Sequence, residues 1–307
     1  MILDVKNLTK TFEKNNTLFT AVDNINFQLD KKECLGIVGE SGSGKSTIAK
    51  MLVKLIEPDN GEIHFLGKDL VTINKSELRK TRKDIQMIFQ NPMDSFNPRK
   101  KLKTSVGAGL KYTLHLNKKQ IEEKVDEALN LVGLKSEYKD RYINKLSGGE
   151  CQRAAIARSV IIEPKLLICD EITSALDVSV QAQIIDLLVQ LREKMDMSYI
   201  FITHDLTLAR YLCDRILVMY KGNEVESGNV VDIFENPMHP YTKLLLSSIM
   251  TIDNIEENKN INYEKLEHSG GCKFKDMCPN RMEICNSRNP EIKEIGNRKI
   301  RCHMYNK

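Results

Sequence analysis

The sequence predicts an α/β fold in which helices cover both faces of a parallel sheet. The first observation is three short apolar runs, at 34–38, 166–170 and 199–202, because continuous runs of this length suit strands buried on both faces. The second is helical periodicity after the first two runs, at about 48–55 and 180–194. Strands that alternate with helices along a chain typically form a parallel sheet.

An antiparallel β subdomain is expected around the first apolar run. Apolar and polar residues alternate at 3–5 and 21–27, as in strands with one buried face. Residues 61–67 have glycine at both ends of a short strand-like stretch, which is typical of a hairpin. These segments lie outside the alternating strand and helix pattern, so they belong to a separate layer.

A small helical subdomain is expected at about 92–148. Pro92 and Pro98 interrupt the chain at its start, and apolar positions recur at helical spacing from 121 to 134. A helix at 149–162 then leads back to the second apolar run. Much later, residues 251–265 are rich in Asn, Glu and Lys, which is typical of a linker.

Composition excludes several classes of protein. The 307 residues carry 46 Lys plus Arg against 42 Asp plus Glu, and this net charge of +4 favours no nucleic-acid partner. No apolar run approaches the roughly 18 residues of a membrane-spanning helix. Asp4 stands where a signal peptide is apolar. We therefore expect a chain that neither crosses a membrane nor is secreted, although it can lie against a membrane.

A glycine-rich loop that matches the pattern G-x4-G-K-[ST] follows the first apolar run. Glycines allow its backbone amides to turn inward around phosphates, and the helix after the loop directs its positive end at the same anion. Lys45 would neutralise the β- and γ-phosphates, and the Ser46 hydroxyl would ligate Mg²⁺. The flanking strand and helix favour this interpretation over an ordinary Gly/Ser turn. The residues assigned to nucleotide binding are Gly39, Glu40, Ser41, Gly42, Ser43, Gly44, Lys45, Ser46 and Thr47.

Two acidic residues end the second apolar run. The strand would deliver Asp170 to the metal, and Glu171 would follow as a candidate base for water. Many core strands end in an acidic residue, so an acidic pair at a strand end is not specific by itself. It indicates a metal site here because the same chain contains the phosphate loop. Together the two patterns predict nucleotide hydrolysis.

A second candidate anion site precedes the acidic pair, where two glycines follow Ser147 at the start of a helix. With this segment the sequence resembles the ATP-binding subunits of ABC transporters, in which the signature segment reaches ATP bound to the other subunit. The alternative is a serine that only caps its helix. The residues assigned to this role are Ser147, Gly148, Gly149 and Glu150.

The resemblance extends to the other short elements of that superfamily. It implies that Gln90 touches Mg²⁺ and the attacking water, that Asp177 lies in a loop crossing the dimer interface at the nucleotide, and that His204 holds the γ-phosphate. It also implies an aromatic residue stacked on adenine, for which Phe12 is preferred and Phe19 is the rival. The expected catalytic residues are Glu171, His204 and Gln90, and the expected Mg²⁺ residues are Ser46, Gln90 and Asp170.

Three longer strings, at 89–99, 174–183 and 236–242, narrow the resemblance to importers of oligopeptides, dipeptides or nickel. The resemblance covers essentially the whole chain. It implies an ABC ATPase domain at 1–235, with the P-loop NTPase (RecA-like) fold. It also implies a C-terminal extension of the oligopeptide/dipeptide transporter type at 236–307.

Four of the eight cysteines cluster in that extension. Cys272, Cys278, Cys285 and Cys302 are separated by five, six and sixteen residues, without the close pairs usual in zinc sites. Without an export signal, disulfides are not expected. Four widely spaced thiolates suit a cuboidal iron–sulfur cluster, and the resemblance implies a 4Fe–4S cluster in some relatives. Zinc and no metal at all are the alternatives.

The resemblance implies ATP hydrolysis that drives the import of oligopeptides or dipeptides, with nickel or a metal chelate as the alternative solute. The implied partners are a second, related but non-identical ATP-binding subunit, two transmembrane permease subunits and, through them, an extracytoplasmic solute-binding protein. The chain is then expected to be peripheral, on the cytoplasmic face of the cell membrane. The single cassette and near-neutral charge disfavour an ABC ATPase acting on DNA or ribosomes, and Glu171 and His204 disfavour a pseudo-ATPase.

Overall fold

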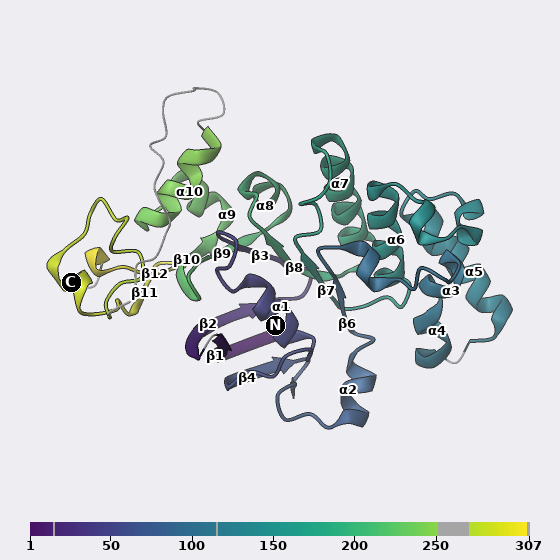
Figure 1. The fold of residues 1–307 in the computed structure, drawn as a ribbon, viewed down its shortest axis with the longest axis horizontal. Helices are drawn as coiled ribbons and strands as arrows, with labels where there is room; N and C mark the ends of the chain where they lie inside the picture. Colours follow the sequence, from purple (N-terminus) through teal and green to yellow (C-terminus); the bar gives the residue numbers. More distant parts are fainter. Residues whose placement is uncertain (15, 115, 251–269, 306–307) are drawn as a thin grey trace.

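The computed structural model describes residues 1–14, 16–114, 116–250 and 270–305. The molecule is elongated, with a sheet in the middle, a helical subdomain at one end and the cysteine-rich segment at the other (Figure 1). The linker predicted at 251–265 lies outside the described residues. The predicted α/β fold is confirmed.

The central sheet has eight strands in the order β11-β12-β10-β9-β3-β8-β7-β6. Strands β9, β3, β8, β7 and β6 pair in parallel, and the other three add antiparallel to them at one edge. The three apolar runs of the sequence are β3, β8 and β7, which lie side by side. The strands are β3 (Cys34–Val38), β6 (Ile85–Ile88), β7 (Leu166–Asp170), β8 (Ser198–Thr203), β9 (Arg215–Tyr220), β10 (Asn223–Asn229), β11 (Ile292–Ile295) and β12 (Arg298–Arg301).

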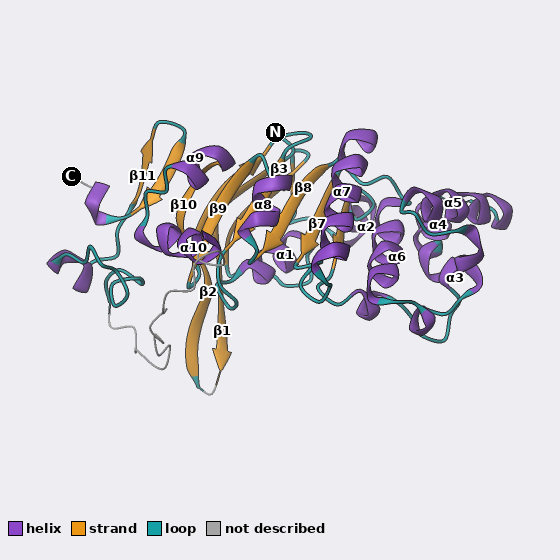
Figure 2. Ribbon diagram, turned by 90° about the horizontal axis from the view of Figure 1, so that it is seen from above, coloured by secondary structure: helices purple, strands orange, loops and turns teal. Residues whose placement is uncertain are grey.

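Alternate residues of the central strands face two separate cores. In β3, Leu35 and Ile37 pack with helix α1 (Lys45–Leu52) and the small sheet, whereas Cys34 and Val38 pack against the helices of the opposite face. Side chains alternate along a strand, so a run that is apolar at every position is buried on both faces. Figure 2 shows helices crossing the strands on that opposite face. They are α6 (Gly148–Val160), α7 (Val178–Met195) and α8 (Leu206–Leu212).

A second, antiparallel sheet has the order β2-β1-β4-β5. Its first two strands are longer than the stretches predicted at 3–5 and 21–27, because they continue as a hairpin that projects from the molecule (Figure 2). Phe12 and Phe19 are cross-strand partners on this projecting part, where exposure removes the apolar alternation. The strands are β1 (Leu3–Lys14), β2 (Thr17–Leu29), β4 (Asn60–Phe65) and β5 (Lys68–Asp69).

The helical subdomain follows β6 and the short helix η1 (Pro92–Ser95). Its longest helix, α5, begins at a capping box, in which the side chains of Asn117 and Gln120 each accept the other's backbone amide at 3.0 Å. The buried residues Val125 and Leu129 attach this helix to the core on the α6 side. The helices here are α3 (Leu102–Val106), α4 (Ala108–Thr113) and α5 (Lys118–Leu131), and α2 (Lys75–Thr81) precedes β6.

The C-terminal segment returns to the central sheet. After α9 (Val230–Glu235) and α10 (Pro240–Met250), the hairpin of β11 and β12 pairs with β10, with Glu226 opposite Ile300. The sequence offers no signal for this pairing, because both hairpin strands are four residues long and largely polar. The cysteine-rich segment is therefore attached to the ATPase domain by main-chain hydrogen bonds.

Helix α1 ends earlier than predicted. It runs from Lys45 to Leu52 instead of reaching residue 55, because Lys54 adopts the left-handed conformation with φ 55°. The start of the helix, directly after the glycine-rich loop, agrees with the sequence.

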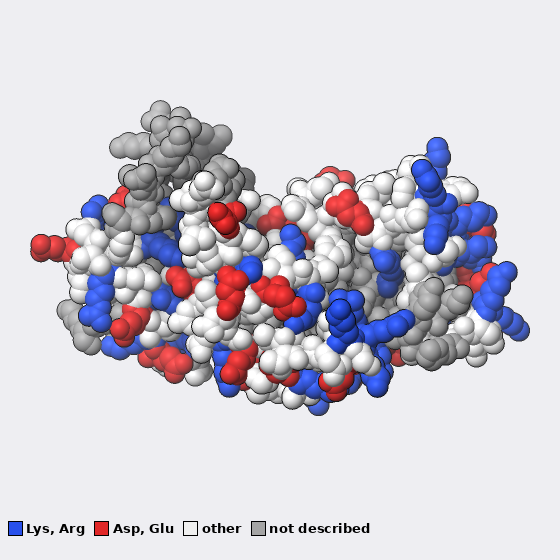
Figure 3. Space-filling model, turned by 60° about the horizontal axis from the view of Figure 1, so that its bottom comes forward, with Lys and Arg blue, Asp and Glu red and all other residues white. Residues whose placement is uncertain are grey.

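None of the helices in the described ranges is long and apolar enough to cross a membrane. On the face drawn in Figure 3, Lys and Arg side chains gather most densely toward the helical end, and the two signs are interspersed over much of the rest. The near-balanced charge of the sequence is thus unevenly distributed over this face.

Candidate active site

The glycine-rich loop joins β3 to α1 at the carboxyl end of the central strands. Gly44 has φ 103°, and a Cβ at this position would lie 2.1 Å from the carbonyl oxygen of Ala21. Gly39 has φ 148°, and its Cβ would lie 2.2 Å from the carbonyl oxygen of Met219. Both positions therefore require glycine, since any side chain would collide with backbone of β2 or β9.

Lys45 is buried at the start of α1. Its Nζ donates hydrogen bonds of 2.8 Å to the carbonyl oxygens of Gly39 and Glu40, and lies 3.7 Å from Oε1 of Glu171. Burial lowers the pKa of Lys45, and the nearby Glu171 and Asp170 carboxylates oppose that effect. An ammonium held in this way inside a loop of backbone amides favours the entry of an anionic ligand.

Ser46 and Asp170 form a pair of oxygen ligands beside the loop. The Ser46 hydroxyl on α1 donates a hydrogen bond of 2.8 Å to Oδ1 of Asp170 at the end of β7. Burial raises the pKa of Asp170, and the hydrogen bond from Ser46 partly offsets this. A hydroxyl and a carboxylate side by side are the hard oxygen donors that Mg²⁺ prefers, so these residues fit a Mg²⁺ site.

The carboxylate of Glu171 is where three other side chains meet. Its Oε2 accepts a hydrogen bond of 3.1 Å from the Gln90 amide and lies 3.8 Å from Nδ1 of His204, while Oε1 faces Lys45. Glu171 has φ 48°, a conformation that non-glycine residues adopt rarely. Gln90, Glu171 and His204 follow β6, β7 and β8, so the parallel sheet brings the three predicted catalytic residues together.

A cavity of about 310 Å³ opens beside these groups. Both candidate aromatic residues, Phe12 and Phe19, reach it from the projecting hairpin. The cavity is therefore lined both by aromatic side chains from the hairpin and by the charged groups Lys45 and Glu171. The lining residues are Phe12, Phe19, Ala21, Ser41, Gly42, Gly44, Lys45, Ser46, Thr47, Gln90 and Glu171.

The second predicted anion site does not line this cavity. Ser147 caps α6, since its Oγ accepts the Glu150 amide at 3.3 Å and its own amide donates to the Glu150 carboxylate at 2.8 Å. The amides of Gly148 and Gly149 stand in the first helical turn, where helix geometry provides no intrahelical partner. Asp177 caps the neighbouring helix α7. The structure thus groups these residues at two exposed helix starts, apart from the loop of their own chain.

The four C-terminal thiols gather in one small segment. The amide of Cys272 donates to the carbonyl oxygen of Cys285 at 2.9 Å. Burial raises the pKa of Cys302 to about 11, and the charges of the other three thiols contribute in the same direction. However, within the ranges that the structure describes, no group of three or more His, Cys, Asp or Glu side chains is arranged to hold a metal ion. As they lie, the four thiols do not form a metal site.

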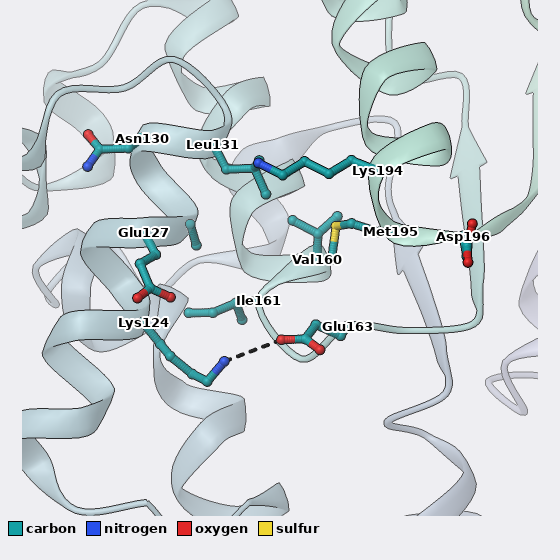
Figure 4. Close-up of a pocket in the computed structure, with 11 residues that line it drawn as sticks. Lys124, Glu127, Asn130, Leu131, Val160, Ile161, Glu163, Lys194, Met195 and Asp196 are labelled. Atoms are coloured by element: carbon teal, nitrogen blue, oxygen red, sulfur yellow. Dashed lines mark hydrogen bonds and ion pairs between the residues drawn. The ribbon is translucent and has the colours of Figure 1, made fainter.

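A larger cavity, of about 870 Å³, lies elsewhere, between α5 and the C-terminal ends of α6 and α7. Figure 4 shows Lys124 of α5 reaching across it to Glu163, with the two side chains 3.3 Å apart. None of the predicted site residues lines it. The smaller cavity, where the charged groups converge, is therefore the candidate active site.

One residue that contacts the glycine-rich loop was not predicted as a site residue. The hydroxyl of Tyr241, in α10, accepts a hydrogen bond of 3.1 Å from the backbone amide of Glu40. The string at 236–242 stood out in the sequence only as part of a resemblance. No local pattern links it to a loop 201 positions away.

The comparisons with known proteins agree with this geometry. The family described as "ABC transporter" matches residues 22–174, and the family described as "Oligopeptide/dipeptide transporter, C-terminal region" matches residues 225–285. The oligopeptide transport ATP-binding protein OppF of Haemophilus influenzae is 43% identical over 294 residues, which cover 93% of this chain and 88% of that protein. The dipeptide transport ATP-binding protein DppF of Escherichia coli is 38% identical over 290 residues, which cover 93% of this chain and 87% of that protein.

Solved structures share the fold. The ATP-binding cassette MJ0796, in a dimeric post-hydrolysis state bound to ADP and Pi, matches with a TM-score of 0.69 and 28% identity over 75% of this chain and 99% of that chain. The cbiO1 protein of Clostridium perfringens, part of the ABC transporter complex cbiONQ, matches with a TM-score of 0.68 and 29% identity. This match covers 83% of this chain and 99% of that chain. Fold and site together define an ATPase whose hydrolysis of ATP is coupled to transport. The chain belongs to the ABC transporter family, in the group of oligopeptide and dipeptide transport ATP-binding proteins.

Proposed function

We propose that the cavity beside the glycine-rich loop binds ATP with Mg²⁺ and that Glu171 is the general base for its hydrolysis. The observation that carries this proposal is the convergence of Gln90, His204 and Lys45 on the Glu171 carboxylate. A carboxylate beside a phosphate site is suited to orient and deprotonate an attacking water.

Each neighbouring residue then has a defined part. Residues 39–47 hold the phosphates through backbone amides, with Lys45 supplying the positive charge. Ser46, Asp170 and Gln90 would hold Mg²⁺, which when bound offsets charge on the phosphates. His204 contacts the γ-phosphate. Phe12 stacks on adenine, and Phe19 lines the same cavity.

We infer that the exposed helix starts at 147–150 and at Asp177 complete the ATP site of a second subunit. This inference is supported by the position of the two helix starts, which do not line the cavity beside the glycine-rich loop of their own chain. In this arrangement the second subunit is a related, non-identical chain. Two permease subunits and an extracytoplasmic binding protein complete the transporter, and the chain lies peripherally on the cytoplasmic face of the membrane.

The proposed solute is an oligopeptide or dipeptide, in keeping with the names of the relatives OppF and DppF. Host cells without this chain should lose uptake of a labelled tripeptide. The parent chain should restore uptake, and a Glu171→Gln chain should not. If uptake of labelled nickel is lost while peptide uptake is intact, the solute is the metal and the peptide proposal is wrong.

We also propose a division into an ATPase domain at 1–235 and an extension at 236–307, and a 4Fe–4S cluster on the four cysteines of that extension. The division is supported by the family match at 225–285. The cluster is supported by the number of thiols and by their gathering in one small segment. Because the described geometry does not form a metal site, cluster binding would require these thiols to move closer together.

A further inference from the structure

We infer that Tyr241 is a positioning residue for the phosphate loop, through which the C-terminal extension sets the affinity of the site for ATP. This inference rests on the proposed ATP site at 39–47. It assigns a role to the segment 236–242, which takes no part in the proposed mechanism of ATP hydrolysis.

Tyr241 and Lys45 hold the same peptide group from opposite sides. The peptide between Gly39 and Glu40 has its carbonyl oxygen on Gly39, which accepts from Lys45 Nζ at 2.8 Å. Its amide is on Glu40 and donates to the Tyr241 hydroxyl at 3.1 Å. A peptide group is planar, so fixing both ends fixes the orientation of the whole unit. Gly39 has φ 148°, and glycine gives this peptide more freedom to rotate than another residue would.

The Tyr241 ring is fully buried, so its hydroxyl has a defined position. Its ring centroid lies 4.5 Å from that of Tyr220 in β9 and 5.5 Å from that of Phe274. Phe274 lies in the cysteine-rich segment, between Cys272 and Cys278. The aromatic cluster therefore connects the extension to the loop through a single packed ring.

The start of α10 is held by a buried carboxylate. Glu226 in β10 accepts the backbone amides of Met238 and His239, each at 2.9 Å, and pairs with Arg298 of β12. The ring nitrogen Nδ1 of His239 accepts the backbone amide of Tyr241 at 3.0 Å. Charge-assisted hydrogen bonds of this kind in a buried site are strong, so Tyr241 is fixed from both its backbone and its ring.

Holding the phosphate loop in place should raise its affinity for ATP. A loop already held in its binding geometry loses less conformational freedom when ATP enters, which raises affinity. Removal of the Tyr241 hydroxyl should therefore weaken ATP binding without changing the chemical step, because the hydroxyl holds the amide of Glu40 whereas the proposed base is the carboxylate of Glu171.

The test compares two buried tyrosines in the full chain. Tyr241→Phe keeps the ring and removes the hydroxyl at the loop. Tyr199→Phe is the matched control: Tyr199 is also fully buried, and its hydroxyl donates to the Leu188 carbonyl at 3.0 Å, beside the opposite end of β3. For each variant, the Kd for a non-hydrolysable ATP analogue with Mg²⁺ is measured by calorimetry, together with KM and kcat for ATP and the unfolding temperature.

We expect Tyr241→Phe to raise Kd and KM about fivefold, the effect of one lost hydrogen bond, with kcat unchanged. Tyr199→Phe should lower the unfolding temperature and leave Kd unchanged. An unchanged Kd in Tyr241→Phe, or an equal rise in Tyr199→Phe, would overturn the inference. Lys45→Ala distinguishes a failure of the proposed ATP site from a failure of the role of Tyr241. If Lys45→Ala also leaves Kd unchanged, the ATP site itself is misassigned. If Lys45→Ala raises Kd and Tyr241→Phe does not, only the role of Tyr241 is wrong.

Discussion

The side-chain amide of Gln90 donates a hydrogen bond of 3.1 Å to the carboxylate of Glu171, although the two residues are 81 positions apart. Both follow neighbouring parallel strands, β6 and β7. Gln90 also directly precedes the helical subdomain, so a movement of that subdomain would change the surroundings of the proposed base. The contact is a direct physical connection between the ATP site and the helical end of the molecule.

Glu171→Gln should abolish turnover while preserving ATP binding. The substitution keeps size and the contact with Gln90 but removes the base, and we expect kcat to fall about 10²-fold or more. The measurement is phosphate release in the assembled transporter, with Glu163→Gln, an exposed glutamate outside the site, as control. Parental turnover in Glu171→Gln would show that another residue is the base.

Lys45→Ala should weaken ATP binding itself. The buried ammonium is lost, and with it a charge-assisted contact to the phosphates, so we expect affinity to fall by about 10-fold or more. Calorimetry with a non-hydrolysable analogue measures this directly. Lys75→Ala, which changes an exposed lysine in α2, should bind like the parent. Equal affinities in all three chains would contradict the assignment of the loop.

Protonation of His239 should destabilise the chain as the pH falls. Burial lowers its pKa from 6.5 to about 4, against a hydrogen bond with the Arg301 backbone that raises it. The unfolded chain therefore takes up this proton first. The contribution of the neutral ring is complete above about pH 6.5 and is lost progressively toward pH 4, for a total of about 3 kcal/mol.

A His239→Asn chain tests this pH dependence, because asparagine retains an acceptor for the Tyr241 amide and does not titrate. The difference in free energy of unfolding between parent and variant should shrink by about 3 kcal/mol from pH 6.5 to pH 4. A difference that stays constant over this range would show that His239 is not buried in its neutral form.

Anaerobic purification should give a brown protein with about four irons per chain, the content of a Cys-bound cuboidal cluster. Serine at any of Cys272, Cys278, Cys285 or Cys302 should bleach the colour, while Cys151→Ser, in α6, should not. ATP binding should persist in the bleached chains. A colourless protein with one zinc per chain would refute the cluster and leave the ATPase assignment intact.

The described site residues that were predictable share a local signal. Residues 39–47 form a complete motif in consecutive positions, and Asp170 and Glu171 end an apolar run. For the same reason the parallel sheet was predictable, since each of its central strands is a short run buried on both faces. The ends of β1 and β2 were missed, because exposed strands carry no apolar alternation.

The sequence alone determined the class of fold, the phosphate loop and the set of acidic and polar residues around it, because strands, helix starts and glycine-dependent turns depend on neighbouring residues. Only the tertiary structure decided that the cysteine-rich segment joins the central sheet at β10 and that Tyr241 reaches the amide of Glu40. Both contacts join parts of the chain far apart in sequence. They depend on the packing of a whole sheet edge and of a buried aromatic cluster, which no short pattern of residues encodes.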